Sequence, residues 1–380
     1  MVTIRPYAPE HADAVHRMRK LAFGSPRDDA WAAESAAWRG FVADVDGATC
    51  GTLRIWAYHQ FFGGRAVPAG GIATVAVDPH ARGRGVAGAL LDAALAGMRE
   101  AGQPLSILFA ATPPLYRGRG WEQVGSTERV QVPISVLAAL PPGRAPVRRA
   151  TEADLPALHQ LYLDVASTVD GMLDRSEPAF QVSRIFELDI VDVVSGDDGL
   201  RGYVAASRPS ANDLTVWDLV VRDAEAALTL LGRLSSWTGM VEVVSLRLVD
   251  PVVHDLLLGM PRDLPRVVEP FMLRVVDLAA AVEVRGWPDY LPDFAVDLEI
   301  TDEHAPWNAG GHRLVHESGA MRLEPGGTGA VRLHARALGP WFAGTATTDT
   351  LRRAGLLEGD APMLDAATTA PRQLRIADNF

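Results

Sequence analysis

The fold is decided by one stretch, Val75-Ala76-Val77-Asp78-Pro79-His80-Ala81-Arg82-Gly83-Arg84-Gly85-Val86-Ala87-Gly88. An apolar strand is predicted to end at Val77, and a helix to begin at Val86, where apolar residues start to recur with the helical period. The first N–H groups of a helix are unpaired, and the helix dipole makes that end positive. The glycines lack Cβ atoms, and Arg82 and Arg84 add charge, so the turn is a predicted pyrophosphate site.

Two other interpretations of this turn are open. Gly83, Gly85 and Gly88 match the dinucleotide pattern G-x-G-x-x-G. That pattern expects an acid, which binds the ribose, at the end of the next strand. The next predicted strand, Leu105 to Ala110, contains no acid, which disfavours a nicotinamide cofactor. A surface loop that merely carries arginines is the plainer alternative.

Length and composition narrow the classes of protein. The chain has 380 residues, of which 48% are hydrophobic, so two or three domains are expected. The net charge of −11 argues against a general nucleic-acid binder and suits a cationic partner. A single cysteine, Cys50, allows no internal disulfide and no cysteine-rich zinc site, and we predict no metal. With no signal core and no long apolar run, a cytoplasmic protein without a membrane span is expected.

The chain divides into two similar segments and a third region. Opening strands are predicted at Ile4 and Val147, and later strands end at Val77 and Val221, so the offsets are 143 and 144 residues. An internal duplication of an α/β unit explains these offsets, although unrelated α/β units also look alike at this level. A proline-rich linker separates the copies, and alternating strands followed by helices predict an α+β region at the end. The predicted domains are 1–143, 144–277 and 278–380.

Several motifs resemble a known superfamily. Arg82-x-x-Gly85-x-Ala87 after a Val-Ala-Val strand resembles the acetyl-CoA signature of the GNAT N-acetyltransferases. Tyr116, followed by a glycine-rich turn and Trp121, is similar to the usual end of a GNAT domain. The three-part layout and the terminal Asp378-Asn379-Phe380 resemble the Eis (enhanced intracellular survival) family. That resemblance implies tandem GNAT-like domains, the second degenerate, a sterol-carrier-like domain and a homohexamer.

The second copy lacks the features of a phosphate site. At the position of the glycine-rich turn it has Arg222-Asp223-Ala224-Glu225. Two acids at the start of a helix would repel a pyrophosphate, and the glycines that allow close approach are absent. We therefore expect the second unit to bind no CoA and to help wall the substrate cleft.

The resemblance also implies roles for individual residues. Tyr116 is expected to be the general acid and the C-terminal carboxylate of Phe380 the general base, whereas a packing role is the plain alternative for a tyrosine. Asp28 and Asp29 are expected to face the acceptor amine, or else to form a solvated helix start. Ala111 and Thr112 match a CoA contact where the family usually has a serine and an acid. Acetyl-CoA contacts are expected from the strand end and the turn, at Val75, Ala76, Val77, Arg82, Gly83, Arg84, Gly85, Val86, Ala87 and Gly88.

The predicted function is acetyl-CoA-dependent N-acetyltransfer to an amine of a cationic small molecule. The resemblance implies aminoglycoside-like, polyamine or lysine-type acceptors, and the net charge of −11 agrees with a cationic acceptor. One alternative is a binding protein for acyl-CoA or lipid without transferase activity. Another is an acetyltransferase that acts on protein lysines.

Overall fold

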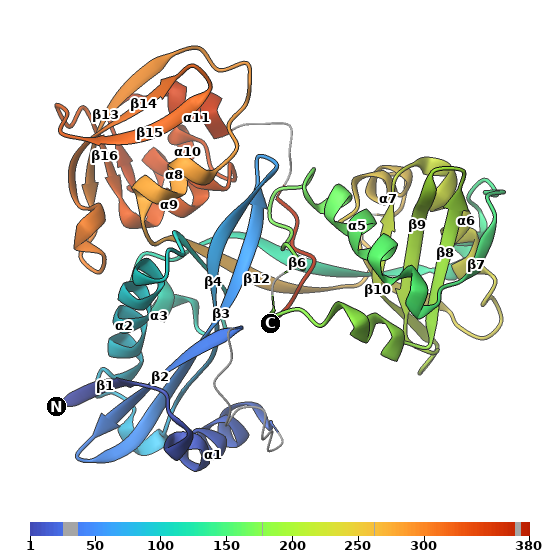
Figure 1. Ribbon diagram of the computed structural model, residues 1–380, viewed down its shortest axis with the longest axis horizontal. Helices are drawn as coiled ribbons and strands as arrows, with labels where there is room; N and C mark the ends of the chain where they lie inside the picture. Colours follow the sequence, from blue (N-terminus) through green and yellow to red (C-terminus); the bar gives the residue numbers. More distant parts are fainter. Residues whose placement is uncertain (26–36, 177, 262, 369–373) are drawn as a thin grey trace.

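The computed structural model describes residues 1–25, 37–176, 178–261, 263–368 and 374–380. Figure 1 shows three lobes: a first unit, a second unit and a C-terminal unit. One sheet of 12 strands runs through the first two units, and a separate five-stranded sheet forms the C-terminal unit. None of the helices in these ranges is long and apolar enough to cross a membrane.

The first unit has helices on both faces of its strands. Val42 packs with Val15 and Met18 of α1, while its neighbour Ala43 packs with Leu90 of α2. Adjacent residues of a strand point to opposite faces, so α1 and α2 cover opposite sides. Its elements are β1 (Val2–Pro6), α1 (Ala12–Phe23), β2 (Trp38–Val45), β3 (Ala48–Phe62), β4 (Arg65–Val77), α2 (Val86–Glu100), β5 (Leu105–Phe109), α3 (Pro113–Arg117), β6 (Glu122–Pro133) and α4 (Ile134–Ala138).

The second unit repeats this order of strands and helices. Val193 packs with Leu158 of α5, and its neighbour Val194 packs with Leu230 of α6, so two helices again cover opposite faces. The elements are β7 (Val147–Arg149), α5 (Leu155–Ala166), β8 (Ile190–Gly196), β9 (Gly199–Ala206), β10 (Asp213–Val221), α6 (Ala224–Ser235), β11 (Val243–Arg247), α7 (Pro251–Leu256) and β12 (Arg266–Val275). The two predicted copies thus share one order of elements and one arrangement of helices on both faces of the sheet.

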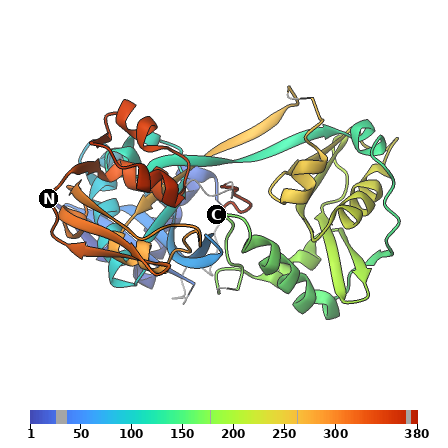
Figure 2. The same ribbon diagram turned by 90° about the horizontal axis from the view of Figure 1, so that it is seen from above.

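The two units exchange their last strands, which the sequence did not predict. The order in the sheet is β1-β2-β3-β4-β5-β12-β6-β11-β10-β9-β8-β7. β12, at the end of the second unit, pairs with β5 of the first, and β6 pairs with β11 of the second. Figure 2 shows both long strands crossing between the lobes. Each unit therefore completes its sheet with a strand from the other.

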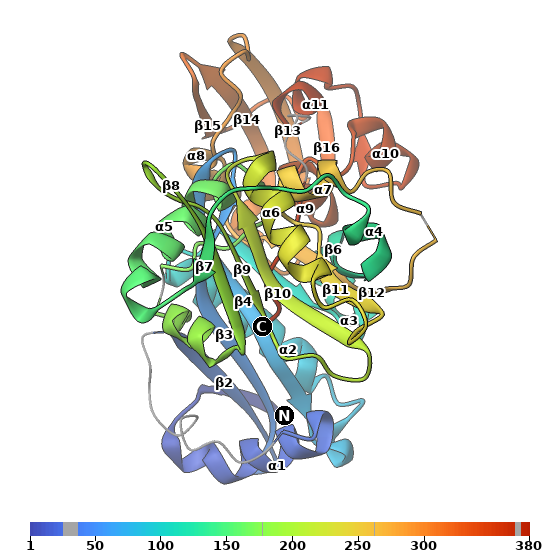
Figure 3. The same cartoon turned by 90° about the vertical axis from the view of Figure 1, so that its right-hand side faces the viewer.

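The C-terminal unit is the predicted α+β region. Its sheet has the order β15-β14-β13-β16-β17. Figure 3 shows this unit at one end of the molecule and α1 at the other. The elements are α8 (Leu278–Val284), β13 (Phe294–Thr301), β14 (Gly310–Glu317), β15 (Ala320–Pro325), β16 (Val331–His334), α9 (Ala335–Phe342), α10 (Thr348–Arg353), β17 (Leu357–Glu358) and α11 (Pro362–Thr368).

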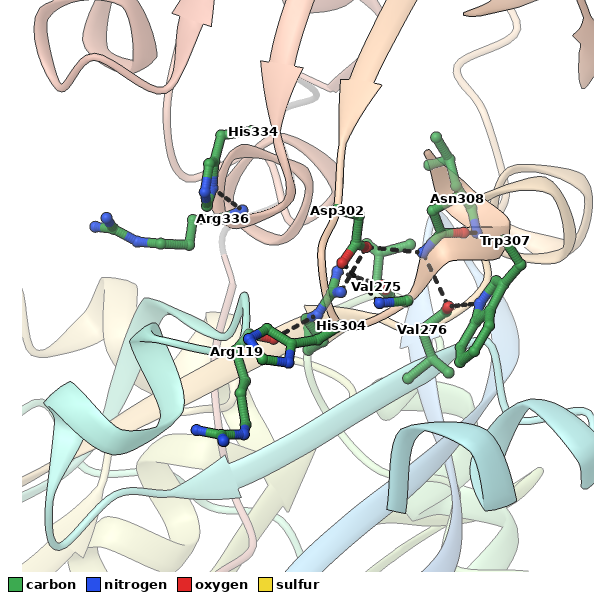
Figure 4. Close-up of polar contacts among 12 residues, drawn as sticks. Arg119, Val275, Val276, Asp302, His304, Trp307, Asn308, His334 and Arg336 are labelled. Atoms are coloured by element: carbon green, nitrogen blue, oxygen red, sulfur yellow. Dashed lines mark hydrogen bonds and ion pairs between the residues drawn. The ribbon is translucent and has the colours of Figure 1, made fainter. Parts of the chain in front are cut away.

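A buried ion pair joins the C-terminal unit to β12, the strand of the second unit that pairs with β5 of the first unit. Arg274 of β12 donates to the Asp302 carboxylate at 2.5 Å, and both side chains are almost fully buried. Arg274 also donates to the Arg119 carbonyl oxygen, and Asp302 accepts from the amide of Asn308 (Figure 4). Every charged group is therefore hydrogen-bonded, as a buried pair requires.

The last residues leave the C-terminal unit and return to the middle of the molecule. Residues 374–380 form no helix or strand, and Figure 1 places the C-terminus between the first and second units. The backbone N–H of Arg375 donates to the Asp170 carbonyl at 2.8 Å, and Arg247 donates to the Ala377 carbonyl at 2.5 Å. Ile376 and Ala377 are buried, so this tail is a packed part of the fold.

Candidate active site

A split between β4 and β5 is the central feature of the first unit. The two strands pair in parallel only from Ala69 to Gly71 of β4, and β5 otherwise pairs with β12. A bulge in β4 opposite β3 includes Thr74, whose φ is +52°. Between Ile72 and Val77, the edge of β4 that faces β5 has no strand partner among the described residues. Its N–H and C=O groups are available to a ligand that enters the split.

The glycine-rich turn lies directly after this free edge. The Asp78 carboxylate accepts a hydrogen bond from the His80 N–H at 2.9 Å and begins the turn. Gly83 and Gly85 have φ values of +76° and +80°, and nothing lies within 4 Å of the place a Cβ would occupy on either. Residues 82–85 are exposed, and α2 begins immediately after them at Val86. This arrangement fits a pyrophosphate at the start of a helix.

Gly88, Ala111 and Thr112 were also expected to contact acetyl-CoA, but their surroundings differ from those of Gly83 and Gly85. Gly88 is buried, and a Cβ there would lie 1.9 Å from the Arg119 guanidinium, so this glycine makes room for a neighbouring side chain. Arg119 donates to the Gly88 carbonyl at 3.1 Å. Ala111 and Thr112 are exposed and lie in the short segment between β5 and α3.

Tyr116 lies on α3, which follows β5. Its side chain is 8% exposed, and its ring meets Trp121 edge to face with the centroids 6.3 Å apart. It belongs to the same apolar cluster as Val75 and Val86, next to the glycine-rich turn. Burial raises the pKa of the Tyr116 hydroxyl, so its proton is held at neutral pH.

Phe380 lies at the point where β4 and β5 separate. Its ring centroid is 4.9 Å from that of Tyr58 on β3 and 5.3 Å from that of Phe109 on β5. A Cβ on Gly71 would come within 3.0 Å of the Phe380 ring. Gly71 is the last residue of β4 that pairs with β5, so the end of the tail packs at the apex of the split.

Arg175 holds the tail against the second unit. Its guanidinium donates to both carboxylate oxygens of Asp218 on β10, at 2.5 and 2.9 Å, and to Asp378 at 2.8 Å. It also lies 4.0 Å from the ring centroid of Tyr162. Burial opposes the charge of Arg175, but the two carboxylates outweigh this effect, so its pKa lies well above the ordinary value. Arg175 therefore stays charged and ties the tail to β10.

A pocket of about 920 Å³ lies between the first two units, beside the tail. Its lining includes Tyr162 and Tyr203 of the second unit. Asp28 and Asp29, which were expected near the acceptor, lie outside the described residues. The charged and aromatic lining residues are Trp38, Arg54, Trp56, Tyr58, His159, Tyr162, Arg175, Phe180, Arg184, Glu187, Tyr203, Trp217, Asp218, Asp378 and Phe380.

Sequence reasoning missed two parts of this pocket. Trp56 and Tyr58 are two residues apart on β3, and this spacing, which puts both on one face, was an available signal. Arg175 gave no signal, because its partners Asp218 and Asp378 are 43 and 203 residues away in the sequence.

The matching position in the second unit is already occupied by its own side chain. The Asp223 carboxylate accepts a hydrogen bond from the Ala226 N–H at 3.0 Å, so it caps α6. It also pairs with Arg201 at 2.8 Å. The helix start that binds phosphate in other proteins is thus satisfied by a carboxylate of the chain itself.

Comparisons with known proteins identify similar domains and similar folds. Residues 3–124 match the model of the acetyltransferase (GNAT) domain, and residues 278–374 match that of a sterol carrier protein domain. An uncharacterized N-acetyltransferase of Streptomyces coelicolor is 28% identical over 77% of this chain and 75% of its own. A GCN5-related N-acetyltransferase from Kribbella flavida is 27% identical with a TM-score of 0.86, and Eis1 from Mycobacterium abscessus is 25% identical with a TM-score of 0.77. Both structures align over the full length of each chain.

The fold and the site define a GNAT-type N-acetyltransferase, and this fold implies the use of acetyl-CoA. More particularly, the chain has the Eis-like tandem GNAT fold, with a degenerate second GNAT unit and a sterol-carrier domain at the C-terminal end.

The glycine-rich turn yields a prediction about cofactor affinity. Gly85→Asp places a carboxylate where the pyrophosphate is expected, and we expect the acetyl-CoA Kd to rise about tenfold or more by charge repulsion. Gly85→Asn is the matched control, because asparagine and aspartate share their size and their tolerance of a positive φ. Calorimetric titration with acetyl-CoA measures both. Equal affinities in the two variants would contradict a pyrophosphate site at this turn.

Proposed function

We propose that the protein transfers the acetyl group of acetyl-CoA to an amine of a small molecule that binds in the pocket between the first two units. The free edge of β4 from Val75 to Val77 and the turn from Arg82 to Gly88 would hold the cofactor, with further contacts from Ala111 and Thr112. The thioester supplies the acetyl group. Backbone N–H groups of β4 would polarise its carbonyl oxygen.

The proposed mechanism transfers protons at two groups, the Phe380 carboxylate and the Tyr116 hydroxyl. The acceptor ammonium gives a proton to the Phe380 carboxylate, and the free amine nitrogen bonds to the thioester carbon. As the carbon–sulfur bond breaks, Tyr116 donates its proton to the sulfur, and solvent returns to Tyr116 the second proton that the nitrogen loses. The raised pKa of Tyr116 suits an acid that must be protonated at each turnover.

One observation carries the proposal: the tail brings Phe380 to the place where the pocket meets the β4–β5 split. Phe380 lines the pocket and also packs over Gly71 at the apex of the split. An amine in the pocket and a thioester in the split would therefore meet beside this residue. A protein that only binds lipid or acyl-CoA has no need of such a junction.

The proposal is tested by following CoA release with a thiol reagent, on a panel of amines, with a chain that ends at Phe380. We expect turnover, and a loss of about a hundredfold in kcat when three residues are added after Phe380, because a general base contributes on this scale. The matched control carries the same three residues before Met1, which is fully exposed. Unchanged turnover in the C-terminally extended protein would contradict the role of the Phe380 carboxylate.

Two expectations belong to the same proposal. A homohexamer would appear in light scattering as a particle of about six times the 40.8 kDa chain mass. A cytoplasmic location would appear as enzyme recovered in the cytosolic fraction of its native cell.

A further inference from the structure

The acidic side chains in the described lining of the pocket are all paired with arginines. In the described lining the acidic side chains are Glu187, Asp218 and Asp378. Arg184 pairs with Glu187 at 3.1 Å, and Arg175 pairs with both aspartates. A carboxylate held by an arginine has its charge offset and its lone pairs engaged. These acids therefore offer little attraction to an acceptor with several ammonium groups.

The floor of the pocket adds a further arginine. Arg54 of β3 is 4% exposed, and its guanidinium carbon lies 3.9 Å from the ring centroid of Trp38 and 4.9 Å from that of Trp56. The described lining thus holds three arginines, Arg54, Arg175 and Arg184, against three acidic side chains. The three acidic side chains are each held by an arginine, so a polycation would find no unengaged carboxylate in the described lining.

Aromatic side chains instead form a continuous array along the pocket. Trp56 and Tyr58 are stacked with their centroids 6.3 Å apart, and Tyr58 contacts Phe180 at 5.2 Å. Tyr58 also contacts Phe380 at 4.9 Å, so the array ends at the tail. These spacings are those of favourable aromatic pairs, and a ligand ring can extend such an array in the same geometry.

We infer that the acceptor is an aromatic monoamine, which lays its ring against the Trp56–Tyr58–Phe180 array and directs its single amine toward Phe380. This inference rests on the proposed function, which makes the Phe380 carboxylate the base. The pocket would recognise two features of such an acceptor, its one apolar ring and its one cationic amine. Polyamines and aminoglycosides carry more positive charges than the acidic side chains of the described lining can offset. They also have no aromatic ring to stack on the array.

The test compares 2-phenylethylamine with spermidine and kanamycin as acceptors for the full-length enzyme. We expect kcat/KM for 2-phenylethylamine to exceed the other two by about tenfold or more. Phe180→Ala should raise KM for 2-phenylethylamine about fivefold and leave KM for acetyl-CoA unchanged. Tyr290→Ala, at an aromatic residue that is 64% exposed and outside the pocket lining, is the matched control and should change neither.

The outcomes separate the acceptor class from the proposed function. Turnover of spermidine or kanamycin above that of 2-phenylethylamine would overturn the acceptor class and leave acetyl transfer standing. Calorimetric binding of 2-phenylethylamine, weakened by Phe180→Ala but without any CoA release, would support the pocket assignment and overturn the transfer. Neither binding nor turnover of 2-phenylethylamine would overturn the inference, whether or not acetyl-CoA binds.

Discussion

Replacing Tyr116 with phenylalanine is expected to lower kcat about a hundredfold or more, because the departing thiolate loses its proton donor. The same factor should appear in kcat/KM, since the proton is transferred only in the transition state. Burial raises the pKa of the tyrosine, so the acid-competent form persists at higher pH than for an exposed tyrosine. The wild-type enzyme should therefore show no loss of activity from this group between pH 7 and its ordinary pKa of about 10.

The control for this change is Tyr290→Phe, which removes a hydroxyl from an exposed tyrosine far from the turn in sequence. Acetyl-CoA affinity, measured by calorimetry, should be the same in Tyr116→Phe and in the wild type, because the hydroxyl acts only on the leaving group. A kcat that survives in Tyr116→Phe would assign the tyrosine to packing, the other role considered for it from the sequence.

The second large effect concerns stability. Arg274→Ala is expected to lower the free energy of unfolding by about 3–5 kcal/mol, because it leaves the Asp302 carboxylate buried without its partner. The side chains of Arg274 and Asp302 are 0% and 1% exposed, so water cannot replace the lost contact. In this variant Asp302 would keep only the hydrogen bonds that it accepts from the Asn308 amide and from the backbone N–H of Ala305. Urea unfolding followed by circular dichroism measures the change.

An exposed ion pair in the C-terminal unit supplies the comparison. Arg332 pairs with Glu358 at 3.4 Å, and the two side chains are 69% and 76% exposed. Arg332→Ala should cost at most about 1 kcal/mol, because solvent screens such a pair. If the two variants lost similar amounts of stability, the joint between the C-terminal unit and β12 would not depend on the buried pair.

The sequence predicted those features that local patterns encode. The strand, turn and helix around Arg82 to Gly88 were predicted from glycines and from apolar periodicity, and both are properties of neighbouring residues. The α+β region and the tandem units followed in the same way. The length of β3, which extends to Phe62, was not predicted, and the Gly63-Gly64 turn that follows it was the unused signal for this long hairpin.

Features that depend on distant residues were not predictable. The position of β12 between β5 and β6 depends on pairing between residues more than a hundred positions apart, for which a single sequence carries no periodic signal. The aromatic array likewise joins Tyr58 to Phe180 and Phe380, from three separate parts of the chain. Phe380 was a candidate only through resemblance, since chain ends usually fray.

The crossed strands β6 and β12 have a consequence for the origin and divisibility of the molecule. A lone copy of the repeated unit would keep a bare sheet edge at β5, while its own last strand would extend from it unsupported. Two such copies complete each other's sheets by exchanging that strand, as the subunits of a domain-swapped dimer do. The present chain has the form of such a dimer joined by a short peptide. Cutting that peptide should leave two fragments that stay associated, whereas neither fragment made alone should be soluble.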